Sequence, residues 1–475
     1  MRTAEQYRAK LRSMRKNVYI DGKLVERDDP QLIPGQNVVA ETFNFAADPR
    51  YAELMTARSH ITGRIINRFT HIHQSVDDLL KKQEMTRLLC QHVGGCIQRC
   101  MGVDALNALS VVTKNCDLAM GTNYHERFLK YLEYYQENDL VGNCAQTDVK
   151  GDRMKRPHEQ VDPDLYLRVV EKRSDGIVVR GAKAHNTIAP YADEIIVLPT
   201  RFMTEKDADW AVAFAIPADT EGVYLICRAT APRPRKELKA PFADYGSADS
   251  LTVFDNVFVP WERVFLCGET SFAGQLAIQF ANFHRHSYTG CKPAVTDIIM
   301  GTAALVAEYN GIEKASHVRD KLAQLVAVAE LVYGTGIAAA VKAHKAASGT
   351  FVPDFVYTNV ARYHAGINIY HEHEILADIA GGLPATLPPE GDFLNPVTRD
   401  FLNKYIMRNP AVSAENQHRC FRLCSDLLCS AHTGVRQVGG IHGGGSPIME
   451  KIAITGMYDI NAKKKIARRL AGIED

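Results

Sequence analysis

The sequence predicts an α+β fold, because three regions of the chain differ in the spacing of their apolar residues. Residues 1–135 and 271–475 repeat apolar side chains every three or four positions, the pattern of helices that bury one face. Residues 136–270 carry short runs rich in β-branched residues between glycines, prolines and aspartates, which is typical of strands joined by turns. This order predicts an N-terminal helical domain, a middle β domain and a C-terminal helical domain with those boundaries.

Individual elements follow from the same patterns. In the N-terminal region we expect helices over residues 51–73 and 77–92. In the middle region, an apolar run at 165–170, the Asp175-Gly176 turn and a second run at 177–179 predict a hairpin. Further strands are expected at residues 194–198, 211–216, 222–227 and 251–259. C-terminal helices are expected at residues 296–309, 316–348, 356–380 and 414–434.

Composition excludes several classes of protein. The formal net charge is +1 over 475 residues, without the basic surplus that nucleic-acid binding requires. No run of about 18 apolar residues occurs, so we expect no membrane span. The polar N-terminal stretch lacks the apolar segment of a signal peptide, so a cytoplasmic location is expected.

The eleven cysteines do not suggest disulfides, because their number is odd and the chain is expected to be cytoplasmic. Most are expected to be small buried apolar residues. Cys96 and Cys100 are four positions apart, so on a helix they share one face and can bind one metal. Cys420 and Cys424 have the same spacing, so spacing alone does not choose between the pairs.

A second group of candidate ligands lies in residues 284–292. His284 and Cys291 are two helical turns apart, with Tyr288 between them and Lys292 beside them. Together with Cys96 and Cys100 they would form a set of three cysteines and one histidine, which suits zinc or an iron–sulfur cluster. An ordinary structural role for this helix stays open at this point.

Polar clusters mark other candidate sites. Residues 147–153 and 183–187 flank the predicted hairpin, where a cofactor can lie across a sheet, although turn chemistry also explains the first. Glycine-rich turns at 380–382 and 442–447 allow close approach of the backbone to a phosphate. The basic stretch 232–239 reads as a solvated loop or, alternatively, as a holder of a phosphorylated ligand.

Several of these segments resemble the 4-hydroxybutyryl-CoA dehydratase/vinylacetyl-CoA Δ-isomerase family, part of the 4-hydroxyphenylacetate 3-hydroxylase group. The resemblance runs nearly end to end, through residues 3–7, 121–125, 136–140, 150–153, 176–185, 253–258, 314–318 and 461–464. It implies an acyl-CoA dehydrogenase-like fold with a β-barrel or sandwich as the middle domain and a helical bundle at the C-terminus. It also implies an acyl-CoA substrate and a homotetramer.

The resemblance further implies FAD and one [4Fe-4S] cluster. The cluster ligands would be Cys96, Cys100, His284 and Cys291, which leaves Cys420 and Cys424 as structural residues. Flavin contacts would fall on Gln146, Thr147, Asp148, Lys150, Gly151, Arg153, Lys183, His185, Asn186 and Thr187, with Thr187 near the reactive end. The adenine half would reach a neighbouring subunit near Arg319, Lys321, Gly381 and Gly382.

The implied reactions are dehydration of 4-hydroxybutyryl-CoA to crotonyl-CoA and isomerisation of vinylacetyl-CoA. A base removes the carbon-2 proton, one-electron transfer to the flavin acidifies the carbon-3 proton, and the histidine-bound iron accepts the hydroxyl as a Lewis acid. His284 is the expected carbon-3 base, and Tyr288 and Lys292 would steer protons or hold the hydroxyl.

Two positions depart from the family pattern. Asp249 stands where the family has a glutamate, so the carboxylate is one methylene shorter. Gly439 stands where the family has a second glutamate, three residues before His442, and glycine cannot accept a proton. We therefore expect the cluster and flavin to be retained while the substrate or proton route differs, with isomerisation as the activity that needs only proton transfers. The sequence assigns no role to Glu450, eleven residues further on.

Two alternatives remain from the residues alone. One is a flavin-dependent 4-hydroxyphenylacetate 3-monooxygenase-like enzyme without a cluster. The other is a non-enzymatic scaffold with a structural zinc at the same cysteines. Analysis of iron, sulfide, zinc and flavin distinguishes these alternatives from the dehydratase.

Overall fold

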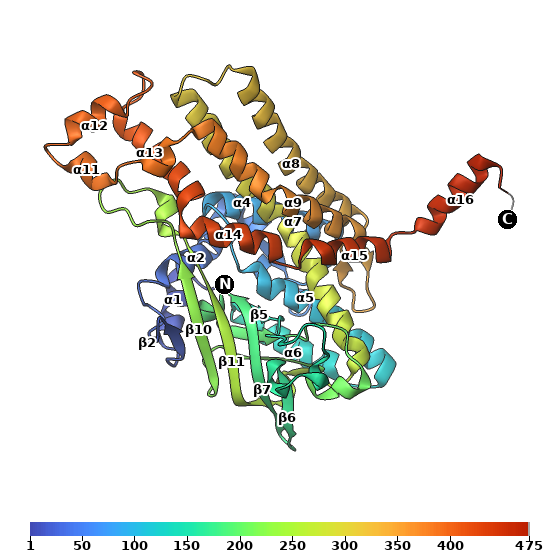
Figure 1. The fold of residues 1–475 in the computed structure, drawn as a ribbon. Helices are drawn as coiled ribbons and strands as arrows, with labels where there is room; N and C mark the ends of the chain where they lie inside the picture. The colour runs from blue at the N-terminus through green and yellow to red at the C-terminus, as the bar shows by residue number, and fades with distance from the viewer. Residues whose placement is uncertain (474–475) are drawn as a thin grey trace.

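The computed structural model describes residues 1–473, with helices packed around two β-sheets (Figure 1). The N-terminal region contains both element types. Its helices are α1 (Ala4–Arg12), α2 (Ile33–Ala47), α3 (Ala52–Met55), α4 (Val76–His92), α5 (Cys100–Met120) and α6 (Tyr124–Glu137). Its strands are β1 (Val18–Ile20), β2 (Lys23–Val25), β3 (Thr56–Arg58) and β4 (Ile65–Asn67).

The prediction of a helix at residues 51–73 is wrong. After the short helix α3, the chain forms the antiparallel hairpin β3–β4. Ser59 caps the turn by accepting hydrogen bonds from the amides of Ile61 and Thr62, and Gly63 has a φ of 70°, which a helix does not allow. The apolar spacing of this segment therefore reflects a half-buried hairpin. The helix expected at 77–92 is confirmed as α4.

The middle region forms two open sheets. Its strands are β5 (Gly142–Ala145), β6 (Arg168–Lys172), β7 (Gly176–Thr187), β8 (Glu194–Val197), β9 (Val212–Pro217), β10 (Val223–Thr230), β11 (Ser247–Pro260) and β12 (Val264–Cys267). One sheet has the order β2-β1-β10-β11-β7-β6, so two N-terminal strands extend it, and the other has the order β12-β9-β8-β5. Residues of both sheets share one core that includes Val179, Phe214 and Phe254. Within residues 1–473 neither sheet closes into a barrel.

The remaining chain is mostly helical. Its elements are α7 (Thr270–Tyr309), α8 (Ser316–Val341), β13 (His344–Lys345), β14 (Phe351–Val352), α9 (Phe355–Ala380), α10 (Leu383–Thr386), α11 (Glu390–Leu394), α12 (Arg399–Tyr405), α13 (Ala414–Cys429), α14 (Ala431–His442), α15 (Pro447–Met457) and α16 (Ile460–Ala471). Helices α4, α8 and α9 pack around the long helix α7. The segment expected as one helix at 414–434 breaks at Ser430, whose hydroxyl caps α14.

A proline inside α7 creates a contact between α7 and α4. Pro293 has no N–H and leaves the carbonyl of Thr289 without its helical partner. The side-chain amide of Gln83 on α4 donates to that carbonyl at 3.3 Å. Gly290 lies beside this contact, and a Cβ there would stand 2.3 Å from the carbonyl oxygen of Gln83. The two helices therefore approach closely immediately beside Cys291.

Two helices are long and apolar enough to cross a membrane by length and composition, α7 and α8. In the most apolar part of α7, 61% of the residues are buried inside the molecule, against 39% for α8. A buried core helix passes the same test, and α7 carries the buried polar residues Arg285, His286 and Lys292. The absence of a membrane span stays a prediction from the sequence.

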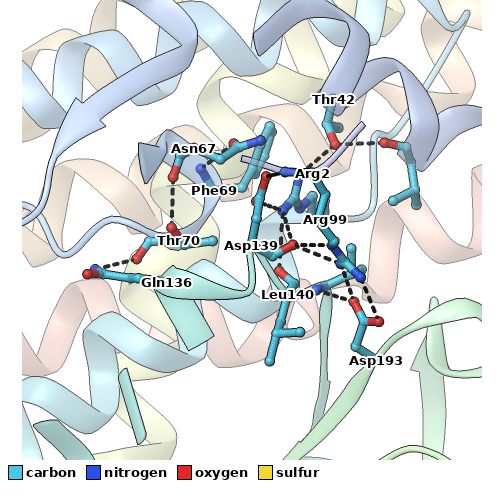
Figure 2. Close-up of polar contacts among 12 residues, drawn as sticks. Arg2, Thr42, Asn67, Phe69, Thr70, Arg99, Gln136, Asp139, Leu140 and Asp193 are labelled. Carbon is cyan, nitrogen blue, oxygen red and sulfur yellow. Dashed lines mark hydrogen bonds and ion pairs between the residues drawn. The ribbon is translucent and has the colours of Figure 1, made fainter. Parts of the chain in front are cut away.

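A buried polar network joins the N-terminus, α2 and the start of α5 (Figure 2). The Arg99 guanidinium donates to the Asp139 carboxylate at 2.6 Å and to the Thr42 hydroxyl at 2.8 Å, and it lies 4.2 Å from the Phe43 ring centroid. Arg2 donates to the Asp139 carbonyl at 2.8 Å and pairs with Asp193 at 2.5 Å. Since Arg99 directly precedes Cys100, this network positions the first turn of α5.

Replacing Arg99 with methionine should therefore destabilise the fold. Asp139 would lose its guanidinium partner while buried, and removal of one partner from a buried pair costs about 3–5 kcal/mol. The free energy of unfolding, measured by urea denaturation under reducing conditions, should fall by that amount. Arg64→Met is the control, because Arg64 pairs with Glu137 at 2.9 Å while 73% exposed, and it should change stability by less than about 1 kcal/mol. Equal losses in both variants would contradict the assigned role of the network.

Candidate metal and flavin site

Four thiols converge where α4, α5 and α7 meet. Hydrogen bonds from the Cys100 and Cys291 thiols hold the pKa of Cys96 well below its ordinary range. Hydrogen bonds with Cys90 and Cys96, together with burial, raise the pKa of Cys291. Cys90, Cys100 and Cys291 are buried, whereas Cys96 is exposed. The three predicted cysteine ligands are therefore neighbours, and Cys90 adds a fourth sulfur beside them.

The loop that carries Cys96 is anchored to the six-stranded sheet. Gln98 adopts a φ of 62°, which is rare for a residue with a side chain. The nitrogen of its side-chain amide donates to the Gly246 carbonyl at 2.9 Å. Its amide oxygen accepts a short hydrogen bond from the Tyr191 hydroxyl, which in turn accepts from the Ala248 amide at 2.9 Å. The loop thus contacts β11 at its first residues, close to Asp249.

Arg436 on α14 lies against the same loop. Its guanidinium donates to the Gly94 carbonyl at 2.5 Å. A Cβ on Gly95 would stand 2.2 Å from that guanidinium, so only glycine permits this approach. Burial lowers the pKa of Arg436, and the nearby thiols of Cys96 and Cys291 oppose that shift. A positive charge therefore stands next to the sulfur ligands.

His284 is oriented by a buried carboxylate. The Asp104 carboxylate lies 2.9 Å from His284 Nδ1 and accepts from the Ser287 hydroxyl at 3.0 Å. It also forms a short ion pair with the buried Lys82 ammonium. Burial alone would raise the pKa of Asp104, but Lys82 and His284 outweigh it and lower that pKa. With Nδ1 held by the carboxylate, Nε2 is the nitrogen left to bind a metal.

These residues fit a metal centre. The ligand atoms of Cys100, Asp104 and His284 lie within 4.8 Å of one another. Cys96 and Cys291 extend that group on the thiol side. Three sulfurs and one imidazole nitrogen are a donor set that suits iron–sulfur or zinc chemistry, and Asp104 supplies the outer-shell carboxylate that such histidines require.

Tyr288 and Lys292 point toward other helices. The Tyr288 hydroxyl donates to the Gly440 carbonyl at 2.8 Å, and the Arg362 guanidinium lies 4.4 Å from its ring centroid. The Lys292 ammonium forms a short ion pair with the buried Glu372 carboxylate on α9. Tyr288 therefore borders the glycine-rich turn, whereas Lys292 is engaged in a buried pair.

Two arginines hold the glycine-rich turn over His284. Arg362 donates to the carbonyls of Gly440, Ile441 and Gly443 at 2.7–2.9 Å, and Arg285 donates to the Gly444 carbonyl at 2.9 Å. A Cβ on Gly444 would stand 3.3 Å from Cδ2 of His284, so the turn packs on that ring. The Glu450 carboxylate, buried beneath the turn, lies 3.5 Å from Arg362. Burial raises the pKa of Glu450.

Thr187 and Asp249 form a pair across β7 and β11. The Thr187 hydroxyl donates to the Asp249 carboxylate at 2.5 Å, and the Thr187 carbonyl accepts from Asn143 at 2.7 Å. Burial raises the pKa of Asp249, with further repulsion from the Cys96 sulfur. The structure therefore brings the predicted flavin-side residues Thr187 and Asp249 to the edge of the thiol site.

The other predicted flavin residues divide into two groups. Lys183 and Asp148 are buried and paired at 2.9 Å, and Asn186 bonds within the sheet to Lys183 and Thr252, so these three support the framework. The side chains still able to face a ligand belong to residues that are at least partly exposed, namely Gln146, Thr147, Lys150, Arg153, His185 and Thr187. Lys150 and His185 have φ values of 77° and 60°, and strained backbone of this kind is common at ligand sites. Hydroxyl, amide and cationic groups on a sheet edge suit a flavin and its phosphates.

The remaining predicted residues lie elsewhere. Arg319, Gly381 and Gly382 are exposed at the ends of α8 and α9, where Lys321 forms a short ion pair with Asp378. Their predicted role is to contact the adenine half of a flavin bound by a neighbouring subunit. Cys420 and Cys424 contact each other inside the helical core, and that hydrogen bond together with burial raises the pKa of Cys424.

The sequence patterns do not indicate five residues that the structure places at the site, namely Asp104, Lys82, Arg362, Arg436 and Gln98. Asp104 follows Cys100 by four residues on α5, which is the one local signal that could have found it. Lys82, Arg362 and Arg436 reach the site only through contacts between distant helices. Gln98 was hidden because its role depends on a left-handed backbone conformation.

Models of a known protein family match nearly the whole chain. The family models for the N-terminal and C-terminal parts of 4-hydroxyphenylacetate 3-hydroxylase match residues 3–266 and 273–472. The chain therefore belongs to the 4-hydroxyphenylacetate 3-hydroxylase family. The oxygenase component of 4-hydroxyphenylacetate 3-monooxygenase, solved with FAD and 4-hydroxyphenylacetate, is 26% identical, with a TM-score of 0.90 over 99% of this chain and 98% of that one.

Within the family, the chain is an enzyme of the 4-hydroxybutyryl-CoA dehydratase/vinylacetyl-CoA Δ-isomerase type. The enzyme of that name from Clostridium aminobutyricum is 44% identical over 99% of both chains. The solved archaeal 4-hydroxybutyryl-CoA dehydratase from N. maritimus is 38% identical, with a TM-score of 0.95 over 100% of this chain and 95% of that one. A glutaryl-CoA dehydrogenase shares the fold alone, at 15% identity and a TM-score of 0.50 over 93% of this chain and 95% of that one, so the fold is acyl-CoA dehydrogenase-like.

The Asp104 carboxylate should control metal retention. In Asp104→Asn, His284 loses its charged acceptor, and loss of such an outer-shell carboxylate lowers metal affinity by about 10–100-fold. Iron per chain after anoxic reconstitution and desalting should therefore fall.

Asp148→Asn is the matched control, because Asp148 is also buried and paired with a lysine, yet it lies on the flavin side. It should retain iron at the level of the unmodified protein. Equal iron loss in both variants would mean that loss of a buried ion pair, rather than loss of His284 orientation, causes the effect.

Proposed function

We propose that the chain dehydrates a 4-hydroxyacyl-CoA, 4-hydroxybutyryl-CoA to crotonyl-CoA, and isomerises vinylacetyl-CoA, using FAD and a [4Fe-4S] cluster. The observation that carries the proposal is the meeting of Cys96, Cys100, Cys291 and the Asp104-oriented His284 beside the Thr187–Asp249 pair. The predicted metal ligands and the predicted flavin-side residues are thus neighbours, since Asp249 lies close enough to Cys96 for the two to repel each other. The 44% identity to the clostridial enzyme supports the same substrate class.

Two separate sets of residues would bind the cluster and the flavin. Cys96, Cys100, Cys291 and Nε2 of His284 would hold the cluster, and Gln146, Thr147, Lys150, Arg153, His185 and Thr187 would contact the flavin. When bound, the flavin supplies one-electron chemistry, which makes the mechanism a radical one, and the cluster supplies a Lewis-acidic iron for a leaving hydroxyl.

Proton transfer falls to side chains of this chain. Asp249 can accept a proton from carbon 2, and its raised pKa makes it a stronger base than a fully solvated aspartate. When Nε2 of His284 is not bound to a metal it can accept the carbon-3 proton, with Nδ1 held by Asp104. On releasing the Gly440 carbonyl, the Tyr288 hydroxyl would become free to donate to a departing oxygen. Lys292 is held in an ion pair with the buried Glu372 carboxylate and stays a candidate proton donor.

The missing family glutamate affects dehydration more than isomerisation. Gly439 lies on α14, one residue before the carbonyl that accepts from Tyr288. No carboxylate therefore extends from this position toward the substrate. Glu450 is buried beside Arg362, and among residues 1–473 neither of its oxygens has a hydrogen-bond partner, so it supports the turn rather than replacing that glutamate.

The two alternatives have weaker support. A phenol monooxygenase has no use for three adjoining thiols and an oriented histidine, and the solved monooxygenase is 26% identical. A zinc scaffold accounts for the sulfur ligands but not for the partly exposed Thr187–Asp249 pair beside them.

A homo-oligomer, by resemblance a homotetramer, is part of the proposal. Helix α16 extends away from the rest of the molecule (Figure 1), and none of its residues is buried, although Ile460, Ile466 and Leu470 are apolar. Such a helix requires a second surface. A neighbouring subunit would also supply the contacts proposed for the adenine half of the flavin near Arg319 and Gly381. A cytoplasmic location accompanies this proposal.

Composition and turnover test the function together. Protein purified without oxygen should contain about four irons per chain, as one cubane cluster requires, together with FAD. It should convert vinylacetyl-CoA to crotonyl-CoA faster than it dehydrates 4-hydroxybutyryl-CoA. Flavin without iron would favour the monooxygenase, zinc without flavin would favour the scaffold, and full dehydratase turnover would contradict altered proton transfer.

Restoring the family carboxylate should raise dehydration. A Cβ at Gly439 meets no atom of residues 1–473 within 4 Å, so a side chain can begin at this exposed position. The rate ratio of dehydratase to isomerase should rise by about 100-fold or more, the contribution typical of a positioned base. Gly434→Glu is the control on the same helix, also with open space, and should leave the ratio unchanged. An unchanged ratio in both variants would show that another group already serves as the base.

A further inference from the structure

A cluster of basic side chains outside the metal site joins the β10–β11 connection to α13. Arg233 and Arg235 belong to the connecting loop, and Arg422 belongs to α13. Arg233 donates to the Ser425 hydroxyl and the Cys429 carbonyl at 3.1 Å, and Arg235 pairs with Asp426 at 2.7 Å. The loop is therefore fixed on α13 rather than freely solvated.

Glu390 on α11 fixes the loop from the other side. Its carboxylate accepts from the backbone amides of Lys236 and Leu238 at 2.7 and 3.1 Å. Arg419 donates to the Lys239 carbonyl at 2.6 Å and is paired with Glu415. The acidic groups here are thus already engaged with backbone or with single partners, whereas Lys236 and Lys239 remain exposed.

Arg422 is left without a hydrogen bond or ion pair among residues 1–473. It lines a small hollow with Arg235, Leu238, Glu390, His418 and Arg419. Burial lowers the pKa of Arg422, Asp426 opposes that shift, and repulsion from Arg233 and Arg235 adds to it. A half-buried guanidinium surrounded by other guanidinium groups is a site that an anion would stabilise.

The cluster is connected to the thiol site. The loop continues to Phe242, whose ring lies 5.8 Å from the Arg436 guanidinium and against Gly94. From Arg422 the chain follows α13 and α14 to Arg436, a path of at most about 25 Å from helical rise and chain length. Figure 1 shows the β10–β11 connection leaving the sheet toward α13, on the side where α14 crosses above the sheet. An extended pantetheine arm spans a distance of this order.

We propose that Arg233, Arg235 and Arg422 bind the phosphates of the nucleotide part of the acyl-CoA substrate. The inference rests on the proposed function in that the substrate is an acyl-CoA. The acyl thioester would lie beside Cys96 and Asp249, and the pantetheine arm would run along α14 past Phe242 and Arg436. Guanidinium groups suit this task because they can present paired donors to phosphate oxygens, and the donors of Arg422 have no partner among residues 1–473.

Substrates that differ only in the nucleotide test the proposal. The ratio of kcat/KM for vinylacetyl-CoA to that for vinylacetyl-pantetheine should fall at least tenfold in Arg422→Gln. CoA itself, titrated calorimetrically into the FAD-loaded protein, should bind more weakly to the variant by a similar factor, and the loss should shrink as salt is raised. Arg422 makes no hydrogen bond or ion pair among residues 1–473 that glutamine would break, so folding should be unaffected.

Arg399→Gln is the matched control, since Arg399 is exposed on α12 and lies only 3.9 Å from Asp400. It should change neither the ratio nor CoA binding. An unchanged ratio and unchanged CoA binding in Arg422→Gln would overturn the proposal, as would loss of FAD instead of CoA affinity, which would assign the cluster to a flavin diphosphate. CoA binding to the unmodified protein without any thioester turnover would overturn the proposed function and leave the nucleotide site standing.

Discussion

The Asp104 carboxylate is the interaction on which the site depends. It is fully buried on α5 and has partners from two other helices, the Lys82 ammonium of α4 and the imidazole and hydroxyl of His284 and Ser287 on α7. A buried carboxylate with one positive partner and two further hydrogen bonds is stable where an unpaired one would not be. The same group fixes the distance between the helices that carry Cys100 and Cys291 and selects the nitrogen of His284 that remains free. Helix packing and ligand geometry therefore have one common cause.

The sheet enters the site through short polar links rather than through apolar packing. Gln98 ties the thiol loop to Gly246 and, through Tyr191, to Ala248, while Asp249 follows directly on β11. Thr187 is fixed to that carboxylate from β7. On the opposite side, Arg362 and Arg285 gather carbonyls of the glycine-rich turn above His284. Hydrogen bonds therefore fix the residues on the sheet side of the thiols and the residues of the turn above His284.

Local patterns predicted most of the longer helices and the hairpin at 165–179, because periodicity and an Asp-Gly turn act within a few residues. The same periodicity failed at 51–73, where Ser59 and Gly63 form a turn. At the site, the approach of Cys96, Cys100, His284 and Cys291 agrees with the family resemblance, whereas Lys82 and Arg436 depend on packing that no spacing reveals. Lys183 illustrates the opposite limit: its polar sequence context suggested a ligand contact, but the sheet places its ammonium on Asp148 inside the core.

The side chain of Gln98 has a consequence for how the two halves of the site communicate. Its amide joins the loop bearing Cys96 to the first residues of β11, and the left-handed backbone at this position leaves little freedom to absorb movement. The loop that bears Cys96 is therefore joined by a hydrogen bond to the residue that precedes the strand carrying Asp249. One side-chain amide thereby connects the predicted metal ligands with the strand that carries Asp249, the predicted catalytic carboxylate.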